Sequence, residues 1–344
     1  MTSLPAVTID STPHDAGPMT VLAARHAPRE LDDSLATAQA LGRVFTAAPR
    51  RDLIDEWEAL ATLASVDVGA ARTIEPHIDA LSILRDARRT AFDGFEVTAL
   101  LWGVFAAEGG DEPLVATPSG QTATLDGVKP WCSLAGRLDA ALVTARVEGD
   151  DERSLFAVHL DEGVTVDDSA WVARGLTEIP SAPVRFTAVR AVPVGGPGWY
   201  LQRPGFAWGG VGVAACWYGG AVGIARAVLH AAAASRDPHA LAHLGAVDEL
   251  LHSARRAIAE AAELATLDDG AHRLTAKRVR ATVARVCDEI IDRAHRVLGP
   301  APLALDVEYT KRVADLQLYV RQHRAERDLA SLGASLTDSE RRPW

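Results

Sequence analysis

Two apolar runs, Ala140-Ala-Leu-Val-Thr-Ala-Arg-Val147 and Ser154-Leu-Phe-Ala-Val-His-Leu160, lie on either side of Glu148-Gly149-Asp150. Their branched and aromatic side chains favour extended backbone, whereas glycine beside acidic residues favours a turn. Similar short runs occur at Thr122–Leu125, Gly163–Val166 and Val184–Val192. Strands at this spacing, separated by turn residues, predict an antiparallel sandwich or barrel. We place this middle β domain at residues 100–198.

Helical patterns flank the β domain on both sides. From Leu31 to Arg89 the chain is rich in Ala, Leu and Glu, with breaks expected near Pro49 and Pro76. After Val211 the helical period returns, with breaks at Asp237-Pro238, Asp268-Asp269-Gly270 and Gly299-Pro300. We therefore predict an α+β protein with an N-terminal helical domain (21–99), the β domain, and a C-terminal four-helix bundle (199–334). A flexible arm (1–20) and a tail (335–344) complete the chain.

Composition excludes several classes of protein. The chain has 344 residues and a net charge of −11, without a basic stripe, so nucleic acid is not expected as a partner. The three cysteines, Cys132, Cys216 and Cys287, are far apart, which argues against a disulfide framework and against a zinc site. Residues 1–18 lack the apolar stretch of a signal peptide. We expect a cytoplasmic protein without a metal.

One apolar segment is long enough to cross a bilayer. Phe206 to Ala225 contains no charged residue. It also contains several glycines, among them Gly209, Gly210 and Gly212, which favour a loop in its first half. We predict a glycine-rich loop followed by a buried core helix that begins near Val211, and no membrane span.

The most specific local motif is Gly127-Val-Lys-Pro-Trp131-Cys-Ser133. In an extended segment, side chains two apart share a face, so Trp131 and Ser133 would present an indole and a hydroxyl side by side. Such a pair suits a planar heteroaromatic ligand, because the indole packs on the ring while the hydroxyl bonds a ring nitrogen. The alternative is a core tryptophan beside a serine in a turn.

This motif resembles the second flavin-contacting segment of acyl-CoA dehydrogenases, a Lys-x-Trp-x-Thr/Ser strand. Upstream, Phe105-Ala-Ala-Glu-Gly-Gly-Asp-Glu-Pro113 resembles their first flavin loop in altered order, and implies that Phe105, Ala107 and Glu108 contact the flavin. The α, β, α order also matches from about Leu31 to Gly333. The resemblance implies bound FAD, a homodimer or homotetramer, an electron-transfer partner, and oxidation of the CH–CH group of a small acyl thioester.

The resemblance also implies FAD contacts from the C-terminal region that reach a neighbouring subunit. Arg236-Asp-Pro-His-Ala-Leu-Ala-His243 keeps an arginine and a histidine of one family segment but is too short for its Phe-Gly loop. Arg296-Val-Leu-Gly299-Pro300 stands where the family has Gln-x-x-Gly-Gly. The proline removes an N–H and fixes φ, while Arg296 would offer charge to phosphates instead. Alternatively, Arg236 and Arg296 are solvated helix ends.

The family's catalytic glutamate is missing where the resemblance would place it. Eight residues after Asp315, in the Arg312-Val-Ala-Asp315 helix signal, stands His323. Helical spacing puts this histidine on an apolar stripe with Tyr309, Val313, Leu316 and Val320. Imidazole is a common general base near neutral pH, so His323 is a candidate base. The alternative is a buried structural histidine.

Two other functions stay open. Flavin-dependent monooxygenases share this fold and include members with a helix-borne histidine; such an enzyme would receive reduced flavin from a reductase. The loss of the glutamate and the weakening of two FAD segments also suit a non-catalytic subunit of a hetero-oligomeric dehydrogenase. We interpret Glu75-Pro76-His77-Ile78-Asp79 as a helix break with a capping role, since its spacing matches no metal motif.

Overall fold

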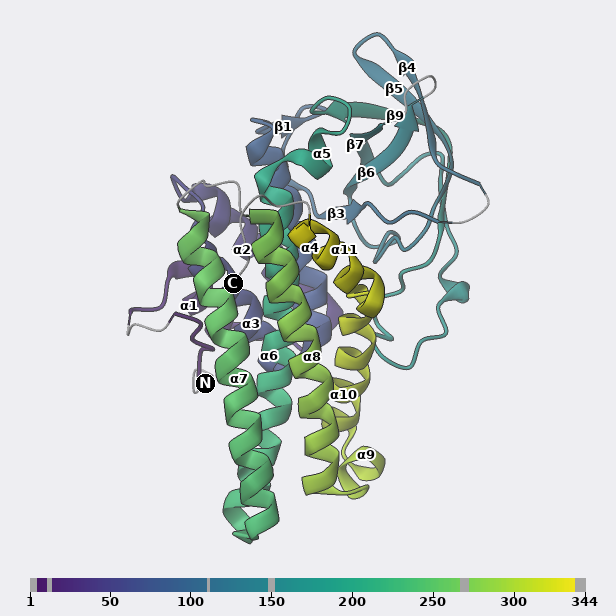
Figure 1. The fold of residues 1–344 in the computed structure, drawn as a ribbon. Helices are drawn as coiled ribbons and strands as arrows, with labels where there is room; N and C mark the ends of the chain where they lie inside the picture. Colours follow the sequence, from purple (N-terminus) through teal and green to yellow (C-terminus); the bar gives the residue numbers. More distant parts are fainter. Residues whose placement is uncertain (1–4, 11–13, 110–111, 148–151, 267–271, 338–344) are drawn as a thin grey trace.

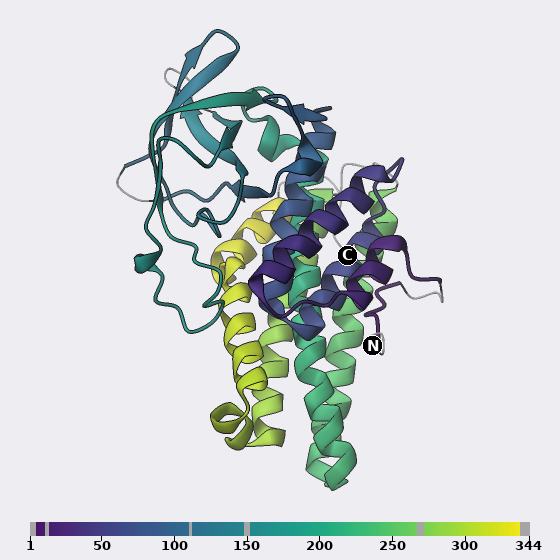
Figure 2. The ribbon, with the colours of Figure 1, turned by 180° about the vertical axis from the view of Figure 1, so that it is seen from behind.

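A helical region, a β domain and a long helical bundle follow one another along the chain in the computed structural model (Figure 1). The structure describes residues 5–10, 14–109, 112–147, 152–266 and 272–337. Figures 1 and 2 show the β domain over one end of the helices, while the bundle extends away from it. The predicted turns at Glu148-Gly149-Asp150 and Asp268-Asp269-Gly270 lie outside the described residues.

The N-terminal region has four helices, α1 (Pro18–Arg25), α2 (Leu31–Ala47), α3 (Leu53–Val66) and α4 (Val68–Asp86). Aspartates cap two of them, because the Asp52 side chain accepts from the first N–H groups of α3 and Asp67 does so for α4. The break expected at Pro76 is wrong, since α4 runs through this proline. Packing of α4 against α2, α3, α6 and β3 overrides the local penalty of a proline.

The segment at 5–10 is packed, although it falls in the stretch predicted to be a flexible arm. Val7 and Ile9 are buried. The Val7 N–H donates to Thr62 Oγ1 at 2.9 Å, and the Ile9 N–H donates to Glu58 Oε1 at 2.6 Å. Polar side chains of α3 thus form the hydrogen bonds that a neighbouring strand would otherwise provide to this backbone. Local sequence does not predict such long-range hydrogen bonds.

The β domain is a closed, barrel-like sheet. A short hairpin precedes it, made of β1 (Ala91–Phe92) and β2 (Phe95–Glu96). The sheet contains β3 (Trp102–Phe105), β4 (Val115–Ser119), β5 (Thr122–Lys129), β6 (Ala140–Val147), β7 (Arg153–His159), β8 (Val164–Val166) and β9 (Val184–Val194). It closes because β6 pairs with both β4 and β7. Pairings of β3 and β4 with β6 are parallel, so the purely antiparallel prediction is wrong in this respect. Turn residues in the sequence predict hairpins, but they do not predict parallel pairing between strands that are distant in the chain.

The C-terminal region is helical. It contains α5 (Trp199–Gln202), α6 (Pro204–Ser235), α7 (Pro238–Ala265), α8 (His272–Leu298), α9 (Ala301–Leu305), α10 (Val307–Tyr319) and α11 (Ala325–Thr337). The helices end and begin near Asp237-Pro238 and Gly299-Pro300, as the sequence predicts. The expected glycine-rich loop before Val211 is instead the first part of α6.

The glycines of α6 serve close helix packing. At Gly219, an added Cβ would lie 2.1 Å from the carbonyl oxygen of Ala61, so only glycine lets α6 approach α3 this closely. By length and composition α6 could cross a membrane, but 78% of its apolar window is buried inside the protein. That burial identifies it as a core helix.

Two groups of buried apolar side chains hold the fold together. The larger lies among the helices and reaches the β domain through Trp102, Leu142 and Leu155. The smaller fills the barrel and includes Phe105, Phe156 and Phe186. The larger core surrounds α6, and the candidate site described below lies beside the N-terminal part of this helix.

Candidate functional site

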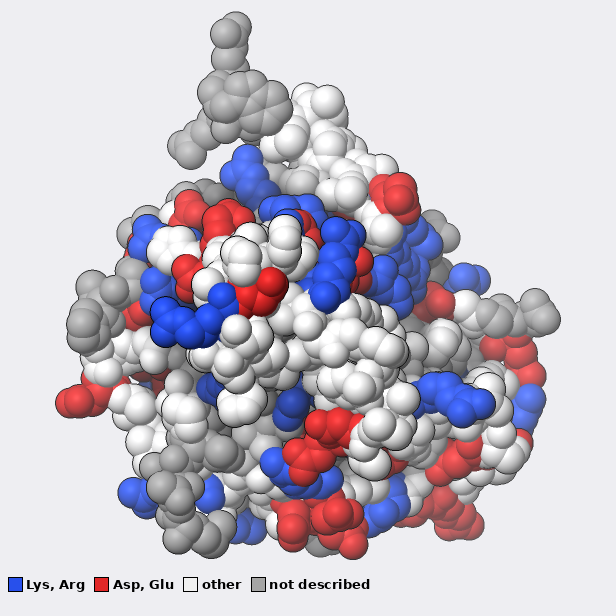
Figure 3. Space-filling model, turned by 90° about the horizontal axis from the view of Figure 1, so that it is seen from below, with Lys and Arg blue, Asp and Glu red and all other residues white. Residues whose placement is uncertain are grey.

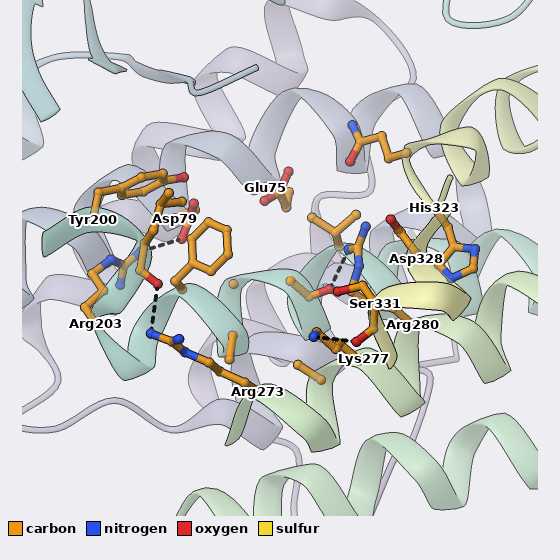
Figure 4. A pocket seen from close by; sticks show the side chains of 18 residues that line it. Glu75, Asp79, Tyr200, Arg203, Arg273, Lys277, Arg280, His323, Asp328 and Ser331 are labelled. Atoms are coloured by element: carbon orange, nitrogen blue, oxygen red, sulfur yellow. Dashed lines mark hydrogen bonds and ion pairs between the residues drawn. The ribbon is translucent and has the colours of Figure 1, made fainter. Parts of the chain in front are cut away.

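A cavity of about 600 Å³ lies between α4, α5, α6, α8 and the segment that leads from α10 into α11. This volume is in the range of pockets that bind small molecules. Figure 4 shows charged side chains of both signs around it. Those that the chemistry below uses are Glu75, Asp79, Arg203, Arg273, Lys277, Arg280, His323 and Asp328.

Glu75 and Asp79 lie one helical turn apart on the cavity side of α4 (Figure 4). Glu75 is 8% exposed, and it accepts a long hydrogen bond of 3.4 Å from the Tyr319 hydroxyl. Its ion pair within the described residues is with Arg72, at 3.9 Å. Burial raises the pKa of Glu75 to about 7, and Arg72 opposes this rise only in part.

Asp79 is held beside an arginine at the base of the cavity. Its Oδ1 lies 3.6 Å from Nη2 of Arg203 but has no hydrogen-bond partner among the described residues. Burial raises the pKa of Asp79, while Arg203 and Arg51 lower it. Gly209 makes room for this carboxylate, because a Cβ there would lie 2.8 Å from Oδ1.

The cations of the cavity wall donate to protein acceptors. Nη1 of Arg280 donates to the carbonyl oxygen of Gly210 at 2.9 Å, and Nζ of Lys277 donates to Ser335 Oγ at 2.7 Å. Arg203 pairs with Asp86 at 2.7 Å. These side chains form a polar wall whose hydrogen bonds are already directed into the protein.

His323 is buried and lines this cavity. Helix α10 ends at Tyr319, and a 3-10 turn over Val320–Gln322 follows, so His323 stands just past the helix rather than on it. Burial lowers the pKa of His323; Asp328 opposes that shift, and Arg280 adds to it. A lowered pKa favours the neutral imidazole over the imidazolium.

Ser133 is buried between α4 and the loop before β9. Its Oγ accepts a hydrogen bond from Nη2 of Arg72 at 2.7 Å and lies 2.7 Å from Ser181 Oγ. Trp131, by contrast, is 61% exposed. The expected extended segment is wrong, because φ is 61° at Trp131 and 58° at Leu134, and the chain turns there. The indole and the hydroxyl therefore do not share a face.

Arg72 links the two halves of the site. One end of its guanidinium bonds Ser133, the other faces Glu75, and its centre lies 5.5 Å from the ring centroid of Tyr319. The cavity and the predicted flavin segment are thus connected through one charged side chain.

The residues of the first predicted flavin loop have other partners. Phe105 is buried inside the barrel, and Ala107 is half-buried. Oε1 of Glu108 accepts from Nζ of the buried Lys129 at 2.7 Å and lies 3.1 Å from Arg153. Gly110 and Asp111 lie outside the described residues.

The C-terminal residues predicted to reach FAD lie far from Ser133 in the same chain. Arg236 ends α6 and is exposed, and His243 is near the start of α7. Arg296 forms an ion pair with Asp292 near the end of α8, and Gly299 follows with a φ of 67°. Figure 1 shows that these helix ends lie opposite the β domain. They can meet the predicted flavin segment only in another copy of the chain.

One cluster of carboxylates has a metal-like arrangement. Oxygens of Asp67, Glu178 and Asp315 lie within 4.8 Å of one another. Nζ of Lys311 contacts all three, at 3.0, 2.7 and 2.7 Å. The ammonium group thus supplies the positive charge that these acids require.

Sequence reasoning missed Glu75 and Asp79 as cavity residues. The signal was present, because these acids are spaced i, i+4 between the apolar residues Ile74, Ile78 and Leu81. Interpreting Pro76 as a break concealed that spacing. A helix continued through the proline places both acids on one side.

Solved structures resemble the whole chain, although the sequence matches no protein-family model and no curated protein. The FMN-bound structure of TdsC, a dibenzothiophene monooxygenase from a Paenibacillus species, is 16% identical, with a TM-score of 0.77 over 94% of this chain and 96% of that one. The chain has the acyl-CoA dehydrogenase fold.

Two other similar structures agree with this fold. KijD3, in complex with FMN and a dTDP-linked 3-amino-4-keto sugar, is 19% identical, with a TM-score of 0.77 over 99% of this chain and 98% of that one. The methanesulfinate monooxygenase MsuC from Pseudomonas fluorescens is 17% identical, with a TM-score of 0.73 over 94% and 97%. At such identities the likeness establishes architecture, and the chemistry must be argued from the site.

Proposed function

We propose that this protein is a flavin-dependent monooxygenase that receives reduced FMN from a separate reductase and oxygenates a small polar molecule. The substrate occupies the cavity between α4, α6 and α8. Structures of the same fold that are named as monooxygenases or hold FMN support the proposal. The expectation of FAD gives way to FMN on the same grounds.

The wall of the cavity mixes charged and apolar side chains. Glu75 and Asp79 face the space, and Leu201, Phe206 and Val213 also line it. A plain acyl chain would leave the charged groups without water or a hydrogen-bond partner. A small molecule with polar groups on an apolar frame matches both parts of the wall, so we favour it over an acyl thioester.

We place the flavin ring at Ser133 and Ser181, whose two hydroxyls can bond it. Trp131 is exposed and does not share a face with Ser133, so we do not assign its indole to the same ring. Reduced flavin, when bound, would supply the two electrons that activate molecular oxygen. Arg72 would hold Ser133 in place, and His323 would exchange a proton with the substrate from the opposite side of the cavity.

The proposed assembly is a homodimer or homotetramer, joined at the end of the bundle opposite the β domain. Exposed apolar side chains gather at this end, including Leu305 and Val307, which are each 84% exposed. Figure 3 shows basic and acidic side chains interspersed over the same face. Such a mixture of apolar and charged surface suits contact with another protein. Cytoplasmic location stays a prediction from the sequence.

The deciding experiment measures oxygen uptake by the purified protein with FMN and an unrelated flavin reductase. Uptake that requires both reduced FMN and a polar substrate supports the monooxygenase. Bleaching of bound flavin by acyl-CoA without oxygen would establish the dehydrogenase instead. Failure to bind either FMN or FAD in a fluorescence titration would point to the non-catalytic subunit.

A further inference from the structure

The connection from β8 to β9, residues 167–183, is a long loop that carries Ser181, and we call it the Ser181 loop. All of its residues are described, and it contains one 3-10 turn (Asp168–Ala170) but no strand or longer helix. Figures 1 and 2 show it running from the β domain to the side of α10. Connections of this length without regular structure are uncommon and often serve a function. The course of such a loop is set by its contacts.

The last part of the Ser181 loop is held beside the proposed flavin segment. Two backbone hydrogen bonds, of 2.8 and 3.1 Å, join N–H groups in residues 132–134 to carbonyl oxygens in residues 180–182. They bring Ser181 Oγ to 2.7 Å from Ser133 Oγ. The position of the Ser181 hydroxyl therefore depends on the course of the loop backbone.

The middle of the Ser181 loop is held against α10. The Leu176 N–H donates to Oδ1 of Asp315 at 2.6 Å, and the Glu178 carboxylate pairs with Nζ of Lys311 at 2.7 Å. The backbone also comes very close to this helix, because a Cβ at Gly175 would lie 2.1 Å from a carbonyl oxygen of α10. Only glycine permits this approach.

Lys311 reaches the start of α4 as well. Its Nζ lies 3.0 Å from Oδ2 of Asp67, whose side chain caps this helix. Gly69, in the first turn of α4, leaves room for the loop, since a Cβ there would lie 2.1 Å from Oε1 of Glu178. Arg72 follows about one turn later on the same helix. Three segments that are distant in the sequence thus meet at one ammonium group.

The charge of Lys311 is not readily replaced by water at this junction. Asp315 is almost fully buried, with 2% of its side chain exposed. Burial by itself would lower the pKa of Lys311, but Asp67 and Asp315 raise that pKa above its usual value, so the ammonium form is maintained. A buried carboxylate that loses such a partner has to move or take up a proton.

We propose that Lys311 is a positioning residue for the flavin site, because its ammonium group joins α4, the Ser181 loop and α10. The loop brings Ser181 to Ser133 from one side, and α4 brings Arg72, the donor to Ser133, from the other. Lys311 restrains both approaches and so sets the arrangement of the two hydroxyls. This inference rests on the proposed function, for which it names a residue that acts through the loop and the helix.

Hydrogen–deuterium exchange tests the link in the absence of FMN. Lys311→Met keeps a long side chain and removes the charge. We expect residues 174–183 to exchange about tenfold faster in this variant, because the loop loses its ion pair with α10. Lys311→Arg should restore slow exchange, and Gly69→Ala should increase it without removing any charge. Wild-type exchange of the loop in Lys311→Met would overturn the inference.

FMN binding tests the consequence for the site. In a fluorescence titration, at a temperature where circular dichroism shows every variant folded, Lys311→Met should weaken FMN binding about fivefold, the effect of one misplaced hydrogen bond. Lys311→Arg should bind FMN within about twofold of the wild type. Faster loop exchange with unaltered FMN binding would reduce Lys311 to a structural role and overturn the inference.

Arg293→Met is the matched control. It removes a cation of similar exposure from an ion pair of 2.6 Å with Glu289 on α8. Both loop exchange and FMN binding should stay as in the wild type. Equal losses in Arg293→Met and Lys311→Met would overturn the inference, since general loss of stability would explain both. A wild-type protein that binds no FMN would refute the proposed function itself, a result that the control and the Lys311 variants do not mimic.

Discussion

Replacing Glu75 by glutamine should make the protein more stable as the pH rises, relative to the wild type. Burial raises the pKa of Glu75 from 4.5 to about 7. The folded protein therefore binds more protons than the unfolded chain between these values, and the free energy of unfolding falls as the pH rises through them. At about 1.4 kcal/mol for each pKa unit, the ionised form costs the folded state about 3 kcal/mol. Glutamine cannot ionise, so the variant avoids this cost.

Urea denaturation, followed by tryptophan fluorescence at a fixed protein concentration, measures the effect. Between pH 5 and pH 8, the difference in free energy of unfolding should shift by about 2 to 3 kcal/mol in favour of Glu75→Gln. Glu326→Gln, an exposed change on α11, should leave the pH dependence as in the wild type. A constant difference across this range would refute the reasoning. A shift in favour of the wild type would mean that Arg72 outweighs burial.

Three further changes test other parts of the structure. Gly219→Ala should destabilise the protein by about 1–3 kcal/mol in urea denaturation, because its Cβ collides with Ala61. Gly245→Ala, at an open position of α7, should instead raise the free energy of unfolding by about 0.5–1 kcal/mol. Ser133→Ala should weaken FMN binding about fivefold in a fluorescence titration, from the loss of one hydrogen bond; unchanged binding would place the flavin elsewhere. Lys311→Met should cost about 2 kcal/mol in thermal unfolding near neutral pH, because three carboxylates lose their shared partner. An unaltered Tm would show that water serves them equally well.

Local sequence predicted the parts of the fold that depend on local physics. Branched and aromatic runs separated by glycine and acids, such as Ala140–Val147, became strands. The proline at 238 and the glycine at 299 mark helix ends in the structure, as expected from their backbone limits. The α, β, α order followed from these signals alone.

Features that depend on contacts between distant parts of the chain could not be predicted from local sequence. Helix α4 continues through Pro76 because other elements pack around it, and only this continuous helix places Glu75 and Asp79 together at the cavity. Trp131 and Ser133 were expected to share a face, but a positive φ at Trp131 turns the chain between them. His323 did reach the cavity, although from a turn past the helix end. Parallel pairing of β4 with β6 likewise depends on closure of the whole barrel.

The guanidinium of Arg72 has consequences for how the two ligands sense each other. It divides its donors between Ser133 and Glu75, and so touches both the proposed flavin segment and the cavity. If a flavin binds at Ser133 and a substrate binds beside Glu75, each should change the affinity for the other, and by the same factor.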